Sequence, residues 1–381
     1  MANLLVLGGG FGGLAAAHEL RALLGPEHEI TVVDRGEEFF MGFAKLWDLA
    51  GTRPLREGTR PLAGLAHHGV RFLRAEVNEI DPHSRRVTTD QGDLEADALL
   101  VALGTSASEA QRDLLAGDGA HDLYDHRALP AMRSDLGRVD AGRVVVGILG
   151  GPHRCPPAPF EAALIVDDLL RRRGVRDDVE VVMSTPKPTT LPVAGPDASR
   201  YVADHLAEHG VELRAEHVIA DVDAEAREIV AADGSRLGYD VLLGVCADSP
   251  PAVVAASALA GDDGWILPDP RTLRTDAERV YAVGDCTTLP TATGALPKAG
   301  VFAAAEGRVA ARNMVADLGL GEPAAFDGHG YCFLELPGER VAFVEGDFLA
   351  DPPDVRLTEA DHEQYLRKRA YERDLLERWL G

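Results

Sequence analysis

The sequence predicts an α/β protein in which two Rossmann-like dinucleotide-binding domains follow one another in tandem and a small α+β segment ends the chain. Apolar strands alternate with helical patterns twice along the sequence, and a glycine cluster directly follows the first strand. At 381 residues the chain also exceeds the roughly 250 to 300 residues at which a single core stops growing. We therefore assign residues 1–110 and 248–325 to the first domain, 111–247 to the second and 326–381 to the C-terminal segment.

The first domain is predicted from a run of strands and helices that begins at the third or fourth residue. The expected elements are strands at 4–7, 29–34, 70–75, 98–103 and 279–283, and helices at about 11–24 and 300–318. Strands separated by helices are typical of a parallel sheet with crossover connections. The return of strand 279–283 after the second domain makes this domain discontinuous in sequence.

The second domain repeats the same alternation, and the C-terminal segment departs from it. We expect strands at 144–149, 179–183, 211–213 and 241–243, helices at 160–173 and 199–210, then β patterns at 331–336 and 341–348 and a charged helix at about 359–380. Five positions of 184–198 are Pro or Gly, which predicts a surface connection there.

Composition limits the classes of partner. The formal net charge of −24 opposes binding to nucleic acid, whose phosphates require Lys and Arg. No stretch of 18 uninterrupted apolar residues predicts a membrane span, and the strand that almost immediately follows Met1 leaves no room for a signal peptide, so we expect a cytoplasmic protein. The four cysteines form no Cys-x-x-Cys pair, which argues against a zinc site or a secreted disulfide framework.

A glycine motif predicts a dinucleotide site at the start of the chain. The run Gly-Gly-Gly-Phe-Gly-Gly at 8–13 matches G-x-G-x-x-G between a strand and a helix, where backbone amides approach a pyrophosphate without interference from Cβ atoms. An acidic residue about 20 positions later is expected to bind the ribose. The predicted binding residues are Gly8, Gly10, Phe11, Gly12, Gly13 and Asp34. This motif alone allows FAD or NAD.

Two further segments resemble flavoproteins with two dinucleotide-binding domains. Residues 100–105 resemble their Ala-Thr-Gly strand end, and 280–285 resemble their Gly-Asp strand. The resemblance implies bound FAD, with Gly104, Thr105, Gly284 and Asp285 at the cofactor. It also places Lys298, before the helix that follows, beside the flavin, where a cation favours negative charge on the reduced ring. The alternative for Lys298 is an ordinary surface lysine at a helix start.

The second domain lacks a nucleotide fingerprint. Its first strand is followed by Gly-Gly-Pro-His-Arg-Cys-Pro-Pro at 150–157, and the three prolines remove amide donors and hold the backbone extended. A phosphate cradle is therefore not expected there, and a nicotinamide is not the favoured electron donor.

The run Cys-Pro-Pro-Ala-Pro-Phe-Glu at 155–161 resembles the flavocytochrome c sulfide dehydrogenase and sulfide:quinone oxidoreductase family. That family pairs this cysteine with a distant second one, and Cys332 lies at the matching distance from Lys298. The resemblance implies a Cys155/Cys332 redox pair: hydrosulfide attacks its disulfide, and the released thiolate passes an electron pair to FAD. It also implies that Glu161 moves protons to and from the sulfurs.

Each of these residues also has a structural interpretation. Free cysteines often pack as small buried hydrophobes, and a first-turn carboxylate such as Glu161 is favoured by the helix dipole alone. Cys246 and Cys286 match no redox position and are expected to be structural. No cysteine lies in 39–49, where some relatives attach the flavin, so FAD is expected to bind noncovalently. Lys45 and Trp47 fall in this stretch and are placed near the flavin only by the resemblance.

The resemblance and the expected cytoplasmic location together favour a quinone as electron acceptor and a small sulfur compound as donor. A quinone enzyme needs membrane contact, and the helix at 359–380 mixes apolar and basic residues, as interfacial helices do. Such a helix more often docks on its own protein. Peripheral contact with the inner face of the membrane and a homodimer both stay open. The rival functions are a type II NADH:quinone dehydrogenase-like reductase and a non-catalytic flavin-binding electron-transfer subunit.

Overall fold

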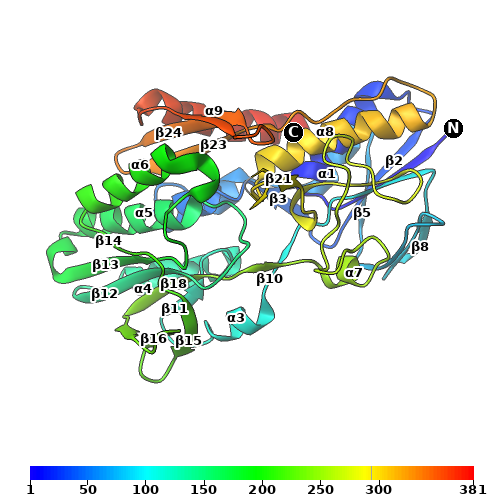
Figure 1. Cartoon of the computed structure of the whole chain (residues 1–381). Helices are drawn as coiled ribbons and strands as arrows, with labels where there is room; N and C mark the ends of the chain where they lie inside the picture. Colours follow the sequence, from blue (N-terminus) through cyan, green and yellow to red (C-terminus); the bar gives the residue numbers. More distant parts are fainter. Residues whose placement is uncertain (293) are drawn as a thin grey trace.

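A computed structural model describes residues 1–292 and 294–381, and two parallel sheets form the two ends of the molecule (Figure 1). The first sheet has the strand order β20-β9-β1-β2-β5. Its strands are β1 (Asn3–Leu7), β2 (Glu29–Asp34), β5 (Arg71–Arg74), β9 (Ala98–Val101) and β20 (Val280–Ala282). All four pairings are parallel, as the alternation of strands and helices predicts. The α/β class predicted from the sequence is confirmed.

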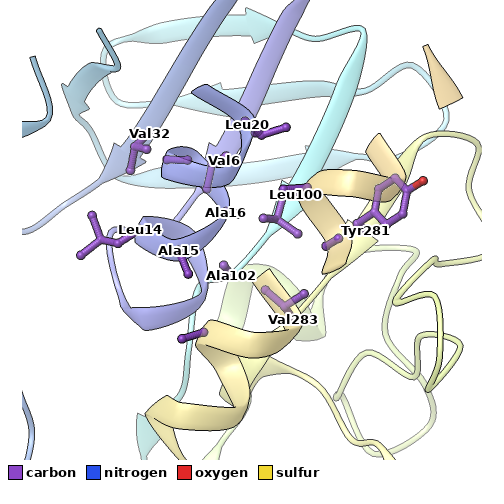
Figure 2. Packing of buried hydrophobic residues seen from close by; sticks show 14 of the residues in the cluster. Val6, Leu14, Ala15, Ala16, Leu20, Val32, Leu100, Ala102, Tyr281 and Val283 are labelled. Atoms are coloured by element: carbon purple, nitrogen blue, oxygen red, sulfur yellow. The ribbon is translucent and has the colours of Figure 1, made fainter. Parts of the chain in front are cut away.

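Helices α1 (Phe11–Leu23) and α8 (Gly300–Asp317) cover one face of this sheet side by side. Figure 2 shows Leu14, Ala15 and Ala16 of α1 against Val6 and Leu100 of the sheet, and all five are buried. Complete burial of a leucine side chain contributes roughly 1.5–3 kcal/mol. The two helices approach closely because Gly307 faces Gly12: a Cβ on Gly307 would overlap the Gly12 carbonyl. This contact places the start of α8 beside the glycine motif.

The second sheet has the same parallel character and the order β11-β18-β12-β13-β14. Its strands are β11 (Ala120–Asp122), β12 (Gly142–Ile148), β13 (Val179–Ser184), β14 (Glu212–Arg214) and β18 (Val241–Val245), and its helices are α4 (Leu129–Leu136), α5 (Ala158–Arg173) and α6 (Gly195–Glu208). Every residue of β18 is buried, which is typical of a central strand covered on both faces.

The prediction of a surface connection through 184–198 is wrong at its end. A short 3-10 turn, η5 (Pro192–Ala194), leads into α6, which already begins at Gly195 with a proline in its first turn. Proline is accepted there because the first N–H groups of a helix have no internal partner. The sequence pattern missed this start because it treated Pro196 as a helix breaker.

The chain passes between the two sheets at two adjacent segments. These are β10 (Ser106–Ala107) and β19 (Asp248–Ser249), which pair with each other antiparallel. The first strand leads into the second sheet and the other leads back. The domain limits drawn from the sequence lie near these positions and stay a proposal.

The C-terminal segment forms an antiparallel sheet and a long helix. Its elements are β23 (His329–Leu336), β24 (Arg340–Asp347), β25 (Asp354–Leu357) and α9 (His362–Leu380). Figure 1 shows them in orange and red along one side of the molecule, next to α5, α6 and α8. Leu376, Trp379 and Leu380 of α9 are buried in the core of the first domain, while Leu366 is 53% exposed. Most of the apolar face of α9 therefore docks on the protein itself.

The remaining elements are short. They are strands β3 (Glu38–Phe40), β4 (Thr59–Pro61), β6 (Val77–Asp81), β7 (Arg86–Thr89), β8 (Gly92–Glu95), β15 (Ile219–Asp223), β16 (Glu228–Ala231), β17 (Arg236–Gly238), β21 (Pro290–Thr291) and β22 (Gly294–Ala295), helices α2 (Ala44–Leu49), α3 (Glu109–Asp113) and α7 (Ala252–Ala255), and 3-10 turns η1 (Leu55–Gly58), η2 (Leu62–His68), η3 (His126–Ala128), η4 (Arg176–Asp178) and η6 (Gly284–Cys286). Over 1–292 and 294–381, none of the helices combines the length and the apolar character needed to cross a membrane.

Candidate active site

The turn between β1 and α1 is built from glycines at positions without room for a side chain. Gly8 has a φ of +108°, and a Cβ there would overlap the Ala102 carbonyl. A Cβ on Gly13 would overlap the Gly8 carbonyl oxygen. Gly10 differs, because no atom lies within 4 Å of the place that its Cβ would take. The backbone thus leaves open space at the positive end of α1, where an anion is stabilised.

Asp34, at the end of β2, fastens this turn. Its Oδ2 accepts the Gly9 N–H at 2.6 Å and its Oδ1 accepts the Gly36 N–H at 2.7 Å. The carboxylate therefore holds the loop after β2 against the loop after β1. This position at a strand end is the one from which an acidic residue binds a ribose in dinucleotide folds.

Two more strands of the first sheet end beside the same turn. Gly104 follows β9 with a φ of +66°, and Gly284 follows β20 with a φ of +73°. The Gly284 N–H donates to Oε2 of Glu306 at 2.6 Å. Glu306 is 2% exposed, and burial raises the pKa of its carboxyl to about 7. Burial also raises the pKa of Asp285.

In the corresponding turn of the second sheet, between β12 and α5, the residues next to the helix leave no amide donor unoccupied. Pro156, Pro157 and Pro159 carry no N–H. The Cys155 N–H donates to the Lys298 carbonyl at 2.8 Å, and the Ala158 N–H donates to the Cys155 carbonyl at 3.0 Å. Every backbone N–H from 155 to 159 is therefore missing or engaged, and this helix start cannot cradle a phosphate.

A cavity of about 330 Å³ joins the two turns and the C-terminal sheet. Ten of the residues predicted from the sequence line it: Gly10, Phe11, Gly12, Gly104, Cys155, Glu161, Gly284, Asp285, Lys298 and Cys332. The turn before α5 supplies Cys155, and β23 supplies Cys332 from 177 positions further along the chain. The fold therefore brings both cysteines to the space between the cofactor-type strand ends.

Four predicted binding residues do not line this cavity. Gly8, Gly13 and Asp34 shape the first turn from behind, as described above. The hydroxyl of Thr105 donates to the Ser249 carbonyl at 2.9 Å and so lies at the β10–β19 crossing.

Cys155 and Cys332 are both free thiols in a site that disfavours their charged form. Burial, followed by the Glu161 carboxylate, raises the pKa of Cys155 to about 12. Burial and the neighbouring Cys155 raise the pKa of Cys332 well above its ordinary value. A thiolate at either position therefore depends on nearby cations.

Glu161 belongs to a buried ion network that the sequence did not reveal. The Glu335 N–H donates to Oε1 of Glu161 at 2.7 Å, and Nζ of Lys368 lies 3.4 Å from the same oxygen. Lys368 also donates to Glu335 at 2.8 Å, and Nε1 of Trp47 donates to that carboxylate at 2.8 Å. Burial raises the pKa of Glu161. Burial alone would lower the pKa of Lys368, but the two carboxylates outweigh it and raise the pKa.

The side chain of Lys298 is held at the cavity by two backbone carbonyls of the segment after β20. Its Nζ donates to the carbonyls of Asp285 at 2.7 Å and Thr287 at 2.9 Å, and lies 3.6 Å from the ring centroid of Trp265. Burial lowers its pKa. The lysine is thus a half-buried cation held at the cavity near the start of α8; its role beside the flavin stays a proposal.

Comparison with known proteins identifies the family. Residues 2–299, more than three quarters of the chain, match the pyridine nucleotide-disulphide oxidoreductase family. The chain belongs to this family. Its sequence relatives include sulfide:quinone oxidoreductases, and the chain is an FAD-dependent oxidoreductase.

Individual relatives span most of the chain. The mitochondrial sulfide:quinone oxidoreductase of Mus musculus is 26% identical over 366 residues, which cover 92% of this chain and 79% of that protein. The sulfide-quinone reductase of Aquifex aeolicus is 25% identical over 404 residues, covering 98% and 90%. A type II NADH:quinone oxidoreductase of Staphylococcus aureus is 25% identical over 337 residues, covering 82% and 81%. The relatives therefore include both enzyme types that the sequence analysis weighed.

A solved structure confirms the fold. The sulfide:quinone oxidoreductase of Aquifex aeolicus superposes with a TM-score of 0.87 at 23% identity, covering 99% of this chain and 91% of that one. The two dinucleotide-binding units and the C-terminal segment are therefore arranged as in this oxidoreductase of the family.

The residues of the cavity fit the flavin dinucleotide of the family. Gly10 leaves open space at the N-terminus of α1, which suits a pyrophosphate. Asp34 stands at the strand end where a ribose hydroxyl needs an acceptor. Phe11, Phe39 and Phe43 give the cavity an apolar wall of the kind that cofactor rings require.

Sequence reasoning missed three of the groups around the thiols: Tyr124, Glu335 and Lys368. One signal pointed to Lys368, since the chain has only four lysines, at 45, 187, 298 and 368. A second signal was Glu335, a charged residue between the apolar Leu334 and Leu336 of a predicted strand. Neither signal names a partner: Lys368 and Glu335 pair with each other within the C-terminal segment, and Glu161 and Trp47 come from the two other domains.

Proposed function

We propose that this protein oxidises sulfide, or a related sulfur compound, through a Cys155/Cys332 redox pair and passes the two electrons by way of noncovalent FAD to a quinone. One observation carries the proposal: both cysteines line the same cavity as the strand ends that suit a flavin, although they are far apart in the sequence. Sulfide:quinone oxidoreductases among the relatives support the same substrate and acceptor.

The chemistry at the cysteines is thiol–disulfide exchange. Hydrosulfide attacks one sulfur of the Cys155–Cys332 disulfide, a new S–S bond forms, and the old bond breaks. The displaced cysteine leaves as a thiolate that carries the electron pair. FAD, when bound, supplies the two-electron acceptor from which the quinone is reduced. Further attack by sulfide on the cysteine persulfide releases the outer sulfur as polysulfide and leaves that cysteine as a second thiolate. Loss of two electrons from the two thiolates, with FAD as the acceptor, re-forms the Cys155–Cys332 disulfide.

Glu161 is the proposed proton carrier for these sulfurs. It lines the cavity beside both cysteines, and its raised pKa lets it hold a proton closer to neutral pH than an exposed glutamate does. Its Oε1 is oriented by the Glu335 N–H and the Lys368 ammonium. Lys298, with the positive end of α8, favours negative charge at the flavin side of the cavity.

A second cavity offers a route for the quinone. It has a volume of about 570 Å³ and shares Val301, Tyr331 and Tyr371 with the first, so the two are adjacent. Its lining combines apolar residues with Arg308, Arg312 and Arg378. A rim of arginines beside an apolar floor supports a peripheral contact with a membrane surface, from which a quinone enters.

The alternative is an NADH:quinone reductase, supported by the relatives of that type. The turn after β12 opposes it, because the backbone N–H groups at 155–159, where α5 begins, are missing or engaged and none of these is left for a nucleotide phosphate. The turn does not distinguish an enzyme from a flavin protein that only relays electrons between partners. The test must therefore also measure turnover with a donor and an acceptor.

Anaerobic stopped-flow absorbance of the flavin band near about 450 nm separates these functions. Sulfide is expected to bleach the wild-type flavin fast and NADH slowly, and added quinone restores the colour. Cys155→Ser and Cys332→Ser should each slow bleaching by at least roughly 1000-fold. The matched control is Cys246→Ser, because Cys246 is buried outside the cavity and should leave the rate unchanged. Bleaching by NADH alone, or unchanged sulfide rates in both cysteine variants, would refute the proposal.

A further inference from the structure

The distribution of lysine in this protein is uneven. Only four of the 38 basic Lys and Arg residues are lysines. Lys45 and Lys298 line the cavity, Lys368 binds Glu161 at its edge, and Lys187 is exposed elsewhere. Lysine differs from arginine in that burial readily moves its pKa into the physiological range. The site therefore holds the titratable cations of a chain that otherwise uses arginine.

Lys45 is the one among them without a role in the mechanism above. It lies in the first turn of α2, and its Nζ donates to the Tyr124 carbonyl at 2.8 Å and lies 5.0 Å from the centroid of the Tyr124 ring. The Tyr124 hydroxyl in turn donates to the Cys155 carbonyl at 3.1 Å. One tyrosine thus joins the lysine to the cysteine, and an ammonium has two further donors to offer.

The cations near Cys155 differ in what neutralises them. Arg154 pairs with Asp248 at 2.9 Å, and Lys368 pairs with Glu335 at 2.8 Å. For Lys45, no carboxylate of the described residues lies within 4 Å. Its positive charge is therefore available to a negative group in the cavity.

Charged and titratable groups from several elements face Lys45. Burial and the Arg154 guanidinium lower its pKa to about 8, against the raising effects of Asp122, Cys155 and Asp125. His126 of η3 also feels its charge. Asp122 lies in β11, and Arg154 and Cys155 lie before α5. Cys155 in turn faces Glu161 of α5, which raises its pKa, and Lys368 of α9 and Lys45, which lower it.

We propose that Lys45 is the counter-cation of the Cys155 thiolate, a positioning residue that keeps this cysteine charged once the disulfide opens. The inference rests on the proposed function, since it assumes that Cys155 is a reacting thiol. When the disulfide bond breaks toward Cys155, its electron pair stays on sulfur and is neutralised by the ammonium.

The test measures the thiolate directly and does not need sulfide. In flavin-loaded Cys332→Ser protein, which cannot form the disulfide, iodoacetamide alkylates Cys155 at a rate that follows the thiolate fraction; peptide mass spectrometry quantifies this cysteine between pH 6 and 10. Adding Lys45→Met should slow alkylation at pH 7.5 by at least about tenfold, because loss of a neighbouring positive charge raises the pKa of the thiol and each pKa unit lowers the thiolate fraction tenfold. Lys187→Met is the matched control and should change nothing.

Lys45→Arg tests whether the titrating amine matters beyond its charge. The arginine variant should keep the wild-type rate below pH 8 and titrate in one step, whereas the wild type should show two coupled steps with one near pH 8. Equal rates and equal pH profiles in the Lys45→Met and wild-type proteins would overturn the inference. Failure of sulfide to bleach the flavin would refute the proposed function and leave this result standing on its own.

Discussion

The two strand-to-helix turns of this protein occupy equivalent places in two similar parallel sheets, yet they are stabilised differently. After β1, glycines fit against backbone atoms within the first domain, and Asp34 closes the loop from the next strand. After β12, prolines remove the amide donors, and the turn is held by the Lys298 carbonyl and by Asp248. The first turn is thus nearly self-contained, whereas the second depends on residues from other parts of the chain.

This difference explains how one fold serves two purposes. A phosphate needs several unoccupied N–H groups at a helix start, and at 155–159, where α5 begins, these groups are missing or engaged. The second turn uses the same location to present a cysteine toward Cys332 of the C-terminal sheet. The backbone topology is the same in both, and the residues of the turn decide the function.

The largest effect is expected in the buried ion network of Lys368, Glu161 and Glu335, which links the start of α5 to the C-terminal segment. Lys368→Met should lower the free energy of unfolding by about 3–5 kcal/mol, because it leaves the carboxylates of Glu161 and Glu335 buried without their ammonium. Urea unfolding at pH 7.5 measures it, with exposed Lys187→Met as the matched control. Adding Glu335→Gln should recover part of the loss. A loss below about 1 kcal/mol would mean that the network does not support this turn.

A smaller effect is expected at Glu306, which accepts the Gly284 N–H at the end of the first sheet. The pKa of Glu306 is about 7 in the folded protein and near 4.5 when unfolded, so the unfolded state releases its proton first as pH rises. The stabilisation by the neutral acid is complete below pH 4.5 and is lost on passing pH 7. The Glu306→Gln variant stays neutral at all pH values. Its unfolding free energy relative to that of the wild type should therefore rise by roughly 3 kcal/mol between pH 4.5 and pH 8. Urea unfolding measures both stabilities. If the two proteins showed the same dependence of unfolding free energy on pH across this range, the raised pKa of Glu306 would be contradicted.

The smallest effect on stability separates the structural glycines from the binding glycine in the first turn. Gly13→Ala should cost about 1–3 kcal/mol, toward the upper value, because the new Cβ meets a backbone carbonyl that cannot rotate away. Gly10→Ala should change stability by less than about 1 kcal/mol, since the space around it is open, but should weaken flavin binding at least about tenfold. Thermal unfolding and flavin retention on ultrafiltration measure the two effects. Equal flavin retention in the Gly10→Ala and wild-type proteins would place the pyrophosphate elsewhere.

Local patterns were sufficient for most of the fold. The strands of the first sheet, four of the five strands of the second and helices α1, α5 and α8 follow from apolar periodicity and from the glycines between β1 and α1, whereas β11 and α4 were not predicted. The start of α6 at Gly195 was missed because proline was treated as a stop signal, although a first helical turn accepts it. Roles for the cysteines came from a family resemblance, and their presence on one cavity is a result of the tertiary structure.

The sequence by itself determined the α/β class, the glycine turn with its acidic partner and the loss of amide donors to the prolines after β12, since each depends on neighbouring residues and backbone stereochemistry. Only the tertiary structure decided which charges surround the thiols. Glu161 bonds the Glu335 backbone 174 positions away and Lys368 207 positions away. Lys45 reaches Tyr124 across 79 positions. Such contacts form when separate elements pack and exclude water, so the energy of a buried charge depends on partners that no local pattern specifies.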